Sequence, residues 1–334
     1  MRPEKNAGSE ARHELAVVRV RAELIRLAPA PPLFVGEVQA AKKFWEFFAN
    51  SIRNAHTRRA YYRAVCRFAA TVGARRVSEL AAVEPSMIGP YVEALAESHS
   101  IPTAKQHLAA LRKLFDFLVV GHVLKHNPAH AVRGPKWVVQ RGKTPVLAPD
   151  DVRALFDAID PKTVLGARDR ALIGVMVYTF ARIGAARSMR LRDYYTEGRA
   201  PMVRLLEKGS KRRDLPVHRV LRRYLDHYIK KAGLVEEKAW LFQSMKGGKL
   251  TGRRLSQADA YRMVGRRVQA AALAVGKRIG NHSWRATGIT TYLNQGGSLE
   301  KAQDIAGHAS ARTTRLYDRR EDSALREEIE RIQF

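Results

Sequence analysis

The last third of the chain carries residue types that can act together on a phosphate group. His282 and Arg285 stand three residues apart, and His308 is followed nine residues later by Tyr317. Arginine presents a fork of donors that matches phosphate oxygens, and tyrosine becomes a nucleophile once a base accepts its proton. The pattern indicates a phosphate clamp with a nucleophile beside it.

The spacing of the first pair fits a helix. His282 and Arg285 lie in His-Ser-Trp-Arg-Ala-Thr-Gly-Ile-Thr-Thr-Tyr-Leu, which has a helical pattern. Residues at i and i+3 of a helix project from one face. We therefore predict that both side chains reach the same phosphate.

The second pair requires a break in the chain. Nine residues make two and a half helical turns, so His308 and Tyr317 cannot share one face of a continuous helix. Gly307 precedes His308, and Ser310 has the type of an N-cap. We predict that His308 lies in a turn and that Tyr317 lies inside the next helix.

Two basic residues upstream complete the set, and neither has an evident ionic partner in the sequence. Arg182 follows Tyr-Thr-Phe-Ala, and Lys208 lies in Glu-Lys-Gly-Ser-Lys-Arg, which has the composition of a hairpin turn. The order Arg, Lys, His-x-x-Arg, His, Tyr resembles that of the tyrosine recombinase, or phage integrase, family, including its Xer-like members. The resemblance spans roughly Thr144 to Ile332 and extends more loosely over Lys42 to Val132.

The chemistry of phosphodiester cleavage explains these residue types. The pentacoordinate transition state concentrates negative charge on the non-bridging oxygens, which the guanidinium forks of Arg182 and Arg285 match. A tyrosine phenol has an ordinary pKa of about 10, so Tyr317 needs a base or nearby positive charge. We assign His282 as the base and Tyr317 as the nucleophile.

The resemblance implies how the cut is completed. The hairpin lysine, Lys208, would protonate the departing 5′ oxygen, with Lys211 a less suitable substitute, and His308 would hydrogen-bond the scissile phosphate. Tyr317 would remain in a 3′-phosphotyrosyl link, which the 5′ hydroxyl of the partner strand attacks without ATP. We expect no metal and no cofactor, because the arginines neutralise the charge that a magnesium pair would otherwise neutralise.

Two positions depart from the family's pattern. Ala185 stands three residues after Arg182, where many relatives have an acidic residue, so any ion pair to Arg182 must come from elsewhere. Trp284 stands inside His-x-x-Arg in place of the common leucine or phenylalanine. We expect altered packing beneath the clamp and retained activity.

The charge balance indicates a polyanionic partner. The chain has 60 lysines and arginines against 32 acidic residues, a formal charge of +28, and is 46% hydrophobic. Such an excess in a folded protein favours double-stranded DNA as the partner. A ribosomal or membrane-surface protein can be as basic, but there is no long low-complexity arm, and no apolar run reaches the ~18 residues of a membrane span. We therefore expect no membrane association.

Cysteine usage and the first residues bear on the compartment. Cys66 is the only cysteine, so no disulfide within the chain is possible, and we predict that it packs in the core. The N-terminus has alternating charges and lacks the apolar core of a secretory signal. We expect a reducing bacterial cytoplasm, with the protein associated with the nucleoid.

Breaker residues divide the chain into domains. The segment from Asn127-Pro128 through Gly134-Pro135 to Thr144-Pro145 is typical of an extended linker. We predict a mainly α fold with a small β-hairpin, in which an α+β catalytic domain (145–334) follows the linker (127–144). Before the linker we expect a helical, SAM-like core-binding domain (37–126). Residues 1–36 form either an arm-like contact or a mobile leader.

Hydrophobic periodicity locates the elements of both domains. The four helices expected in the first domain cover Ala41 to Phe48, Thr57 to Thr71, Glu84 to Ala96 and Thr103 to Val119. Two strands, Met202 to Leu206 and Arg212 to Val217, are expected to flank the hairpin turn of Lys208. The other helices expected in the second domain, besides that of His282, cover Pro149 to Ile159, Asp169 to Thr179, Leu221 to Lys231, Ser256 to Ala274, Leu299 to Ile305 and Ala311 to Arg320.

Exposed basic residues are candidates for contacts with DNA phosphates. The charge run Lys211, Arg212 and Arg213 is either a solvated surface or a contact with the DNA backbone, and we favour the contact. The candidates are Arg58, Arg59, Arg63, Lys105, Arg112, Lys113, Lys211 and Arg212.

The resemblance also implies an assembly. Relatives exchange strands through a Holliday junction within a tetramer, and they dock a C-terminal helix on a neighbouring protomer. Ser323 to Ile332 is such an amphipathic segment, and packing within its own chain is the alternative. The function expected is a site-specific recombinase, or integrase, of a mobile element. A DNA-binding regulator that retained the fold without catalysis is the alternative, and the target sequence stays open.

Overall fold

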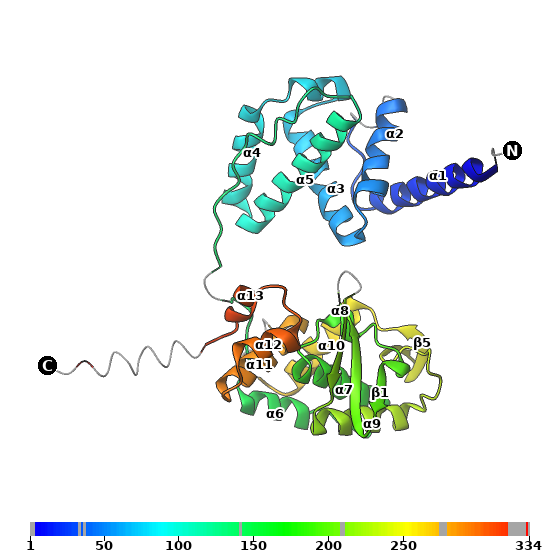
Figure 1. Ribbon diagram of the computed structural model, residues 1–334, viewed down its shortest axis with the longest axis vertical. Coiled ribbons are helices and arrows are strands. Elements are labelled where there is room, and N and C mark those ends of the chain that lie inside the picture. The colour runs from blue at the N-terminus through cyan, green and yellow to red at the C-terminus, as the bar shows by residue number, and fades with distance from the viewer. Residues whose placement is uncertain are drawn as a thin grey trace. The chain divides into compact units, whose positions relative to one another are not determined.

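The computed structural model describes residues 4–32, 35, 38–139, 142–207, 211–273, 279–319 and 332. The chain divides into two compact units, Met1–Val138 and Val139–Phe334 (Figure 1). The first is helical, and the second combines helices with two small antiparallel sheets. This mainly α architecture with a helical N-terminal unit confirms the predicted fold class.

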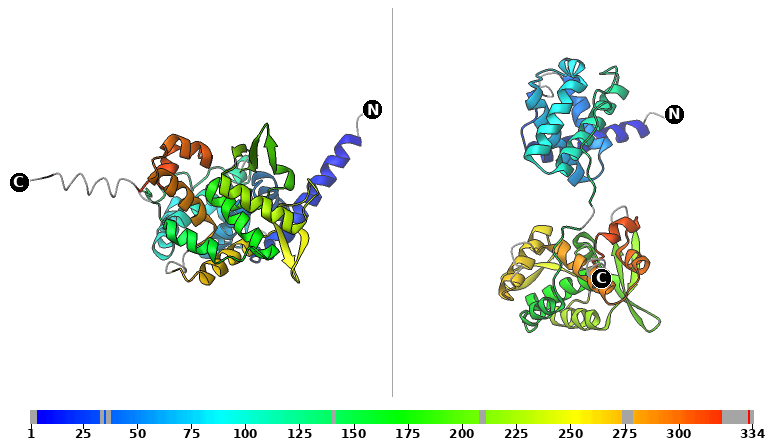
Figure 2. Two further views of the ribbon diagram at one scale, coloured as in Figure 1. Left: turned by 90° about the horizontal axis from the view of Figure 1, so that it is seen from below. Right: turned by 90° about the vertical axis from the view of Figure 1, so that its left-hand side faces the viewer.

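The first unit contains the four predicted helices and an additional one at its start (Figures 1 and 2). Asn54 caps α3, because its side chain accepts hydrogen bonds from the amides of His56 and Thr57, so this helix begins two residues before the expected Thr57. The helices are α1 (Glu4–Ile25), α2 (Val38–Glu46), continued by a π-helical turn (Phe47–Ser51), α3 (Ala55–Val72), α4 (Pro85–Ser98) and α5 (Ile101–Val120), with a 3₁₀ segment at Val77–Ala82.

An aromatic cluster forms the core of this unit. Phe44, Phe48 and Tyr62 are fully buried against one another, and the Tyr62 hydroxyl donates to the Ala28 carbonyl at 2.8 Å. Val20 and Leu24 of α1 are buried in the same core. Each such side chain contributes about 1.5–3 kcal/mol of burial free energy, so the second half of α1 helps to stabilise the unit.

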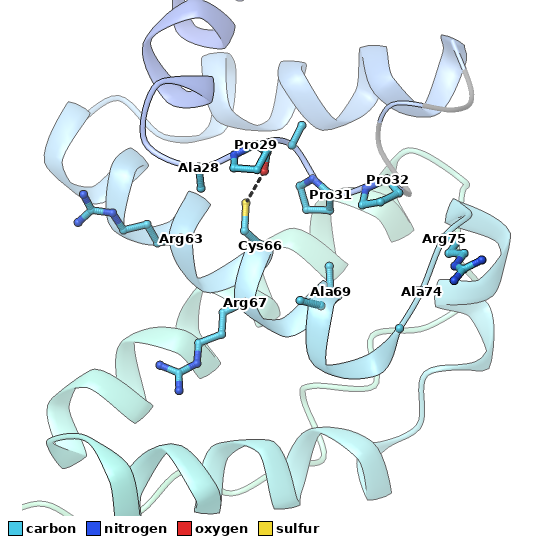
Figure 3. A pocket seen from close by; sticks show the side chains of 13 residues that line it. Ala28, Pro29, Pro31, Pro32, Arg63, Cys66, Arg67, Ala69, Ala74 and Arg75 are labelled. Carbon is cyan, nitrogen blue, oxygen red and sulfur yellow. Dashed lines mark hydrogen bonds between the residues drawn. The ribbon is translucent and has the colours of Figure 1, made fainter.

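Cys66 lies at the wall of a cavity of about 620 Å³ between α3 and the proline-rich segment after α1 (Figure 3). Its Sγ faces the Pro29 carbonyl oxygen at 3.9 Å, and the thiol is only partly buried. Burial raises the pKa of the Cys66 thiol to about 11. The expected core packing is therefore incomplete, and the thiol is unreactive at neutral pH because it stays protonated.

The second unit is built around α7 and a three-stranded antiparallel sheet of order β1-β2-β3. The hairpin β2–β3 was predicted, whereas β1 and the separate hairpin β4–β5 were not. The helices and strands of the second unit are α6 (Pro149–Asp157), α7 (Val164–Tyr178), α8 (Ile183–Ala186), β1 (Tyr194–Glu197), β2 (Ala200–Leu206), β3 (Arg212–Pro216), α9 (Arg219–Ala232), β4 (Gln243–Lys246), β5 (Lys249–Arg254), α10 (Gln257–Ala270), α11 (Asn281–Asn294), α12 (Leu299–Ala306) and α13 (Ala311–Arg315).

Two of these helices differ from the prediction by five residues at one end. The α7 helix begins at Val164 rather than at Asp169, because the Thr163 side chain caps it by accepting from the Gly166 amide at 3.0 Å. The α13 helix ends at Arg315 rather than Arg320. The second difference changes the local setting of the expected nucleophile.

Close packing of α11 against α7 fixes the centre of the unit. A Cβ added at Gly288 would lie 2.1 Å from the Val177 carbonyl oxygen and 2.9 Å from the Phe180 ring. Only glycine permits this approach of the two backbones. The contact holds α11 beside the end of α7, where Arg182 follows.

Candidate functional site

The second unit brings five of the six predicted site residues together. Arg182 is the N-cap residue of α8, and His282 and Arg285 lie on α11 one turn apart. His308 follows α12, and Tyr317 follows α13. The predicted helix that carries His282 and Arg285 is confirmed.

A histidine contacts the tyrosine hydroxyl. The Nε2 atom of His282 lies 2.9 Å from the Oη atom of Tyr317. Burial, followed by the charges of Arg285 and Arg182, lowers the pKa of His282 below its usual range. The ring is therefore neutral at pH 7 and can accept the phenolic proton.

Tyr317 lies in a turn and not inside a helix, so that part of the prediction is wrong. Its amide donates to the Thr314 carbonyl at 2.9 Å, a closing turn at the end of α13. Its carbonyl accepts from the Thr290 hydroxyl of α11 at 3.0 Å. The Gly142 amide also donates to the Leu316 carbonyl at 3.2 Å, so the turn is held from two sides.

Burial and nearby positive charges shift the pKa of the Tyr317 phenol in opposite directions. Its side chain is mostly buried, and burial raises the pKa of the phenol, whereas the charges of Arg285 and Arg182 lower it. Burial prevails, so the phenol is protonated at neutral pH. A nucleophilic role of this neutral phenol would require a base, and the Nε2 atom of His282 contacts its hydroxyl.

His308 occupies a turn, as predicted. Gly307, in the left-handed conformation with φ 60°, ends α12, and Ser310 caps α13 by accepting from the Arg312 amide. The Nδ1 atom of His308 lies 2.9 Å from the Thr314 hydroxyl, and its ring stacks on that of Tyr317 at 5.8 Å between centroids. Burial and the charge of Arg285 lower the pKa of His308 to about 3, so the ring is neutral.

Arg285 is fully buried, and backbone carbonyls hold its guanidinium. It donates from Nη1 to the Phe180 carbonyl and from Nη2 to the Ala306 carbonyl at 2.7 Å. Burial and the charge of Arg182 lower the pKa of Arg285 to about 10, which still leaves it charged at pH 7. These two acceptors come from the ends of α7 and α12, so the arginine joins three elements of the site.

The backbone before Arg182 is strained. Phe180 has φ 51°, a left-handed conformation that costs about 1–2 kcal/mol for a residue with a side chain. Its ring is buried and packs against Tyr292 at 6.0 Å between centroids. This packing offsets the strain, and the turn directs the Phe180 carbonyl toward Arg285.

Arg182, which has no evident ionic partner in the sequence, has one in the structure. Its Nη1 atom donates to the Oε2 atom of Glu207 at 2.8 Å, at the end of β2. The Arg182 side chain is 42% exposed, whereas that of Glu207 is 5% exposed. The acidic partner that Ala185 cannot supply thus comes from the sheet.

Arg213 is a site-adjacent residue that the sequence argument placed wrongly. The charge run that contains it is expected to contact the DNA backbone, yet the Arg213 side chain is 7% exposed and its Nη2 donates to the Oε1 of Glu207 at 2.8 Å. Alternation explains this result, because Arg213 points to the opposite face of β3 from Arg212. The sequence signal that could have identified Glu207, and Arg213 as its partner, is the position of Glu207 directly before Lys208.

The hairpin turn itself, Lys208 with Gly209 and Ser210, lies outside the described residues. Lys211 is exposed, and Arg212 is 54% exposed and donates to Asp214 at 2.7 Å. The expected helix from Ser323 to Ile332 also lies outside them, apart from Ile332 itself. The roles assigned to Lys208 and Lys211 therefore stay predictions.

The basic residues of the first unit divide into two groups. Arg63, Lys105 and Lys113 are exposed, as predicted. Arg58 and Arg112 are not free, because their side chains donate to backbone carbonyls, Arg58 to Phe48 and Ile52 and Arg112 to Ala129 and Val132. Arg59 is bound to Glu23 at 2.6 Å and remains 43% exposed.

In the described part of the chain, no group of three histidine, cysteine, aspartate or glutamate side chains is placed to hold a metal ion. Among the helices described, none is long and apolar enough to cross a membrane.

The arrangement is that of an enzyme that transfers phosphoryl groups through tyrosine, because a hydroxyl, a neutral base and two arginines converge. The comparison with known proteins is more specific. The model of the phage integrase family matches residues 145–323, more than half of the chain, and that of the phage integrase N-terminal SAM-like domain matches residues 41–121. The chain therefore belongs to the phage integrase family.

Individual relatives agree with this assignment. Tyrosine recombinase XerC of Myxococcus xanthus is 29% identical over 235 residues, which are 68% of this chain and 74% of that protein. The XerH site-specific recombinase bound to a palindromic difH substrate, a post-cleavage complex, has the same fold, with a TM-score of 0.66, 21% identity and coverage of 86% and 82%. A lambda integrase tetramer bound to a Holliday junction has a TM-score of 0.64 and 16% identity, with 83% and 76% covered.

Proposed function

We propose that this chain cuts and rejoins DNA as a tyrosine site-specific recombinase, with Tyr317 as the nucleophile. The Oη atom of Tyr317 attacks the scissile phosphorus and forms a 3′-phosphotyrosyl bond, while the bond to the 5′ oxygen breaks. The freed 5′ hydroxyl of the partner strand then attacks the phosphorus of the phosphotyrosyl bond, which forms a new phosphodiester and releases Tyr317. Each step exchanges one phosphoester for another, so no external energy source is needed.

The protons follow the side chains of the site. The phenolic proton of Tyr317 passes to the Nε2 atom of His282, and the departing 5′ oxygen takes a proton from Lys208. Arg182 and Arg285 stabilise the additional negative charge of the transition state. His308, neutral and stacked on the tyrosine ring, donates a hydrogen bond to a phosphate oxygen.

One observation carries the proposal, namely the 2.9 Å contact between His282 Nε2 and Tyr317 Oη beside two arginines. A general base must lie within hydrogen-bond reach of the proton that it abstracts, and this one does. The alternative of a catalytically silent DNA-binding regulator gives no reason for a neutral histidine on a buried tyrosine hydroxyl.

Trapping on a suicide substrate tests the proposal. The protein is incubated with nicked duplexes from the DNA that flanks its gene, and a denaturing gel shows any strand linked to protein. We expect a covalent adduct with the wild-type chain and none with Tyr317→Phe, which removes a single oxygen. Equal DNA binding by both proteins in a mobility shift is the control. Adduct formation by Tyr317→Phe would reject Tyr317 as the nucleophile.

We further propose that four protomers act on two paired DNA sites. The support is the likeness to the lambda integrase tetramer and an apolar cavity of about 400 Å³ on the second unit. Val152, Tyr178 and Tyr292 are among the residues that line it. The segment from Ser323 to Ile332 carries Leu325 and Ile329 and has the composition to fill this cavity on a neighbouring protomer.

Crosslinking on DNA tests that exchange. Ile329→Glu places a charge in the segment and should reduce the tetramer on paired sites, while single-site binding is retained. Unchanged tetramer formation would contradict the exchange. We also propose that the substrate belongs to a mobile element, which recombination assays with the flanking DNA would test. The proposed place of action is the cytoplasm, on the nucleoid.

A further inference from the structure

Glu207 is the one carboxylate that contacts Arg182 in the described part of the chain. The residue one turn further along α8 is Ala185, which is buried and carries no charge. An arginine with a flexible side chain that is 42% exposed has many accessible rotamers. A single buried partner therefore decides where the guanidinium is held.

The Glu207 carboxylate is shared between two arginines, one oxygen to each. Oε2 accepts from Nη1 of Arg182, and Oε1 accepts from Nη2 of Arg213, both at 2.8 Å. Because each oxygen has its own donor, the carboxylate cannot rotate without losing a charge-assisted hydrogen bond. The arrangement fixes the direction in which Glu207 presents its acceptor to Arg182.

Arg213 anchors this carboxylate. Its side chain is 7% exposed, and its Nε and Nη1 atoms are buried without another partner in the described residues. A Cβ added at Gly307 would lie 2.8 Å from the Cδ atom of Arg213, so this arginine packs beneath the turn that carries His308. The anchor is therefore confined by β3 on one side and by that turn on the other.

The cluster is ionised. Burial raises the pKa of Glu207, but the hydrogen bonds from Arg182 and Arg213 lower it more, and the net pKa lies below its usual range. A charged carboxylate that partly neutralises Arg182 also limits the repulsion between Arg182 and Arg285. Two arginines can then stay close to one site before any phosphate binds.

We infer that Glu207 is a positioning residue for the phosphate-binding Arg182, and that Arg213 holds Glu207 in place. This inference rests on the proposed function, in which Arg182 stabilises the charge of the scissile phosphate. Glu207 touches no reacting atom and acts through Arg182. Ala185, on α8, carries no charge that could fill this role.

The test measures single-turnover formation of the covalent adduct on a substrate that traps the wild-type protein. Glu207→Gln keeps the shape of the side chain but removes its charge. We expect its rate to fall about 10- to 100-fold. Arg182→Ala removes a transition-state donor outright, so its rate should fall further, by about 10²- to 10³-fold. Affinity for the DNA should change little, because the remaining basic surface is intact.

A substrate with a methylphosphonate at the scissile position separates positioning from folding. One charged non-bridging oxygen is replaced there by a methyl group, so charge stabilisation by Arg182 matters less. We expect the defects of Glu207→Gln and of Arg182→Ala to shrink together on this substrate. A defect of Glu207→Gln that is equal on both substrates would overturn the inference, and so would a wild-type rate on the ordinary diester.

Two further variants keep the outcome interpretable. Glu207→Asp retains the charge and should fall between wild type and Glu207→Gln on the diester, and it serves alone if the glutamine variant does not fold. Asp226→Asn removes the charge of an exposed carboxylate on α9 that pairs with Arg222 and accepts from the Tyr194 hydroxyl, and it should react like wild type. Absence of any adduct with the wild-type chain would instead reject the proposed function itself.

Discussion

Asp169 and Glu207 of the second unit each bridge a pair of arginines, and these two clusters differ in their exposure. Asp169 binds Arg168 and Arg267, each at 2.7 Å, with side chains that are 1%, 4% and 19% exposed. Glu207 binds Arg182 and Arg213, and there the Arg182 side chain is 42% exposed. Each cluster holds one carboxylate and two guanidinium groups. We call the mostly buried Asp169 cluster closed and the Glu207 cluster, with its exposed Arg182, open.

The difference in exposure separates structure from function. In the closed cluster, Arg168 also donates to the Gln243 carbonyl at 2.8 Å, so α7, α10 and β4 are joined and few donors remain. In the open cluster, one guanidinium turns a face to solvent where an anion can bind. A buried ion pair is weak evidence of stability by itself, but removing one partner from it is strongly destabilising.

The largest expected effect comes from breaking the closed cluster. Asp169→Asn leaves two mostly buried arginines without a counter-charge, and we expect the free energy of unfolding to fall by about 3–5 kcal/mol. The rate of adduct formation at a temperature where the variant is folded should stay near that of wild type. Urea unfolding measures the first quantity. A loss below that of Glu207→Gln would contradict the contrast between the two clusters.

The next effect concerns Arg285, which carbonyls hold rather than a carboxylate. Gly288→Ala places a methyl group 2.1 Å from the Val177 carbonyl oxygen and presses on Phe180, whose carbonyl binds Arg285. We expect destabilisation at the upper end of about 1–3 kcal/mol, together with a loss of cleavage. Gly265→Ala on α10, where an added Cβ meets nothing within 4 Å, is the matched control. Wild-type cleavage by Gly288→Ala would show that this contact does not set Arg285.

Acid should destabilise the second unit through His308. Its folded pKa of about 3 lies below the ordinary value of 6.5, so the unfolded chain binds more protons between these values. The stabilisation is fully present above pH 6.5 and is lost as the pH falls toward 3, and about 2 kcal/mol of it is lost by pH 5. His308→Gln should reduce this loss in thermal unfolding at pH 5 compared with pH 7.5. An equally steep fall in the variant would reject the assignment.

The smallest effects are expected in the first unit, where an exposed arginine, Arg63, contrasts with one that is held by backbone carbonyls, Arg112. Arg63→Ala should weaken DNA binding and reduce the slope of log affinity against log salt by about 1, without changing stability. Arg112→Ala should lower the stability of the unit, because Arg112 donates to the Ala129 and Val132 carbonyls, and it should leave the salt slope unchanged. The reverse pattern would mean that exposure does not identify the DNA-binding arginines.

The residue types of the site and their local elements could be predicted from the sequence. The i and i+3 spacing of His282 and Arg285 fixes a helix face, and Gly307 with Ser310 fixes a turn, because these are short-range properties of the backbone. The same reasoning failed at Tyr317. A helix end depends on what the last turn can bond to, and here the Thr290 hydroxyl holds the Tyr317 carbonyl from another helix.

The amino-acid sequence by itself determined the chemistry that is available, a tyrosine, a base and arginines, and the order of the helices that carry them. Only the tertiary structure decided which arginines are committed to the protein and which remain open to DNA. Arg58 and Arg213 look like surface charges in the sequence, yet carbonyls and Glu207 occupy them. Such pairing depends on how the chain turns back on itself and on which face of a strand each side chain lies, and charge patterns along a sequence do not contain that information.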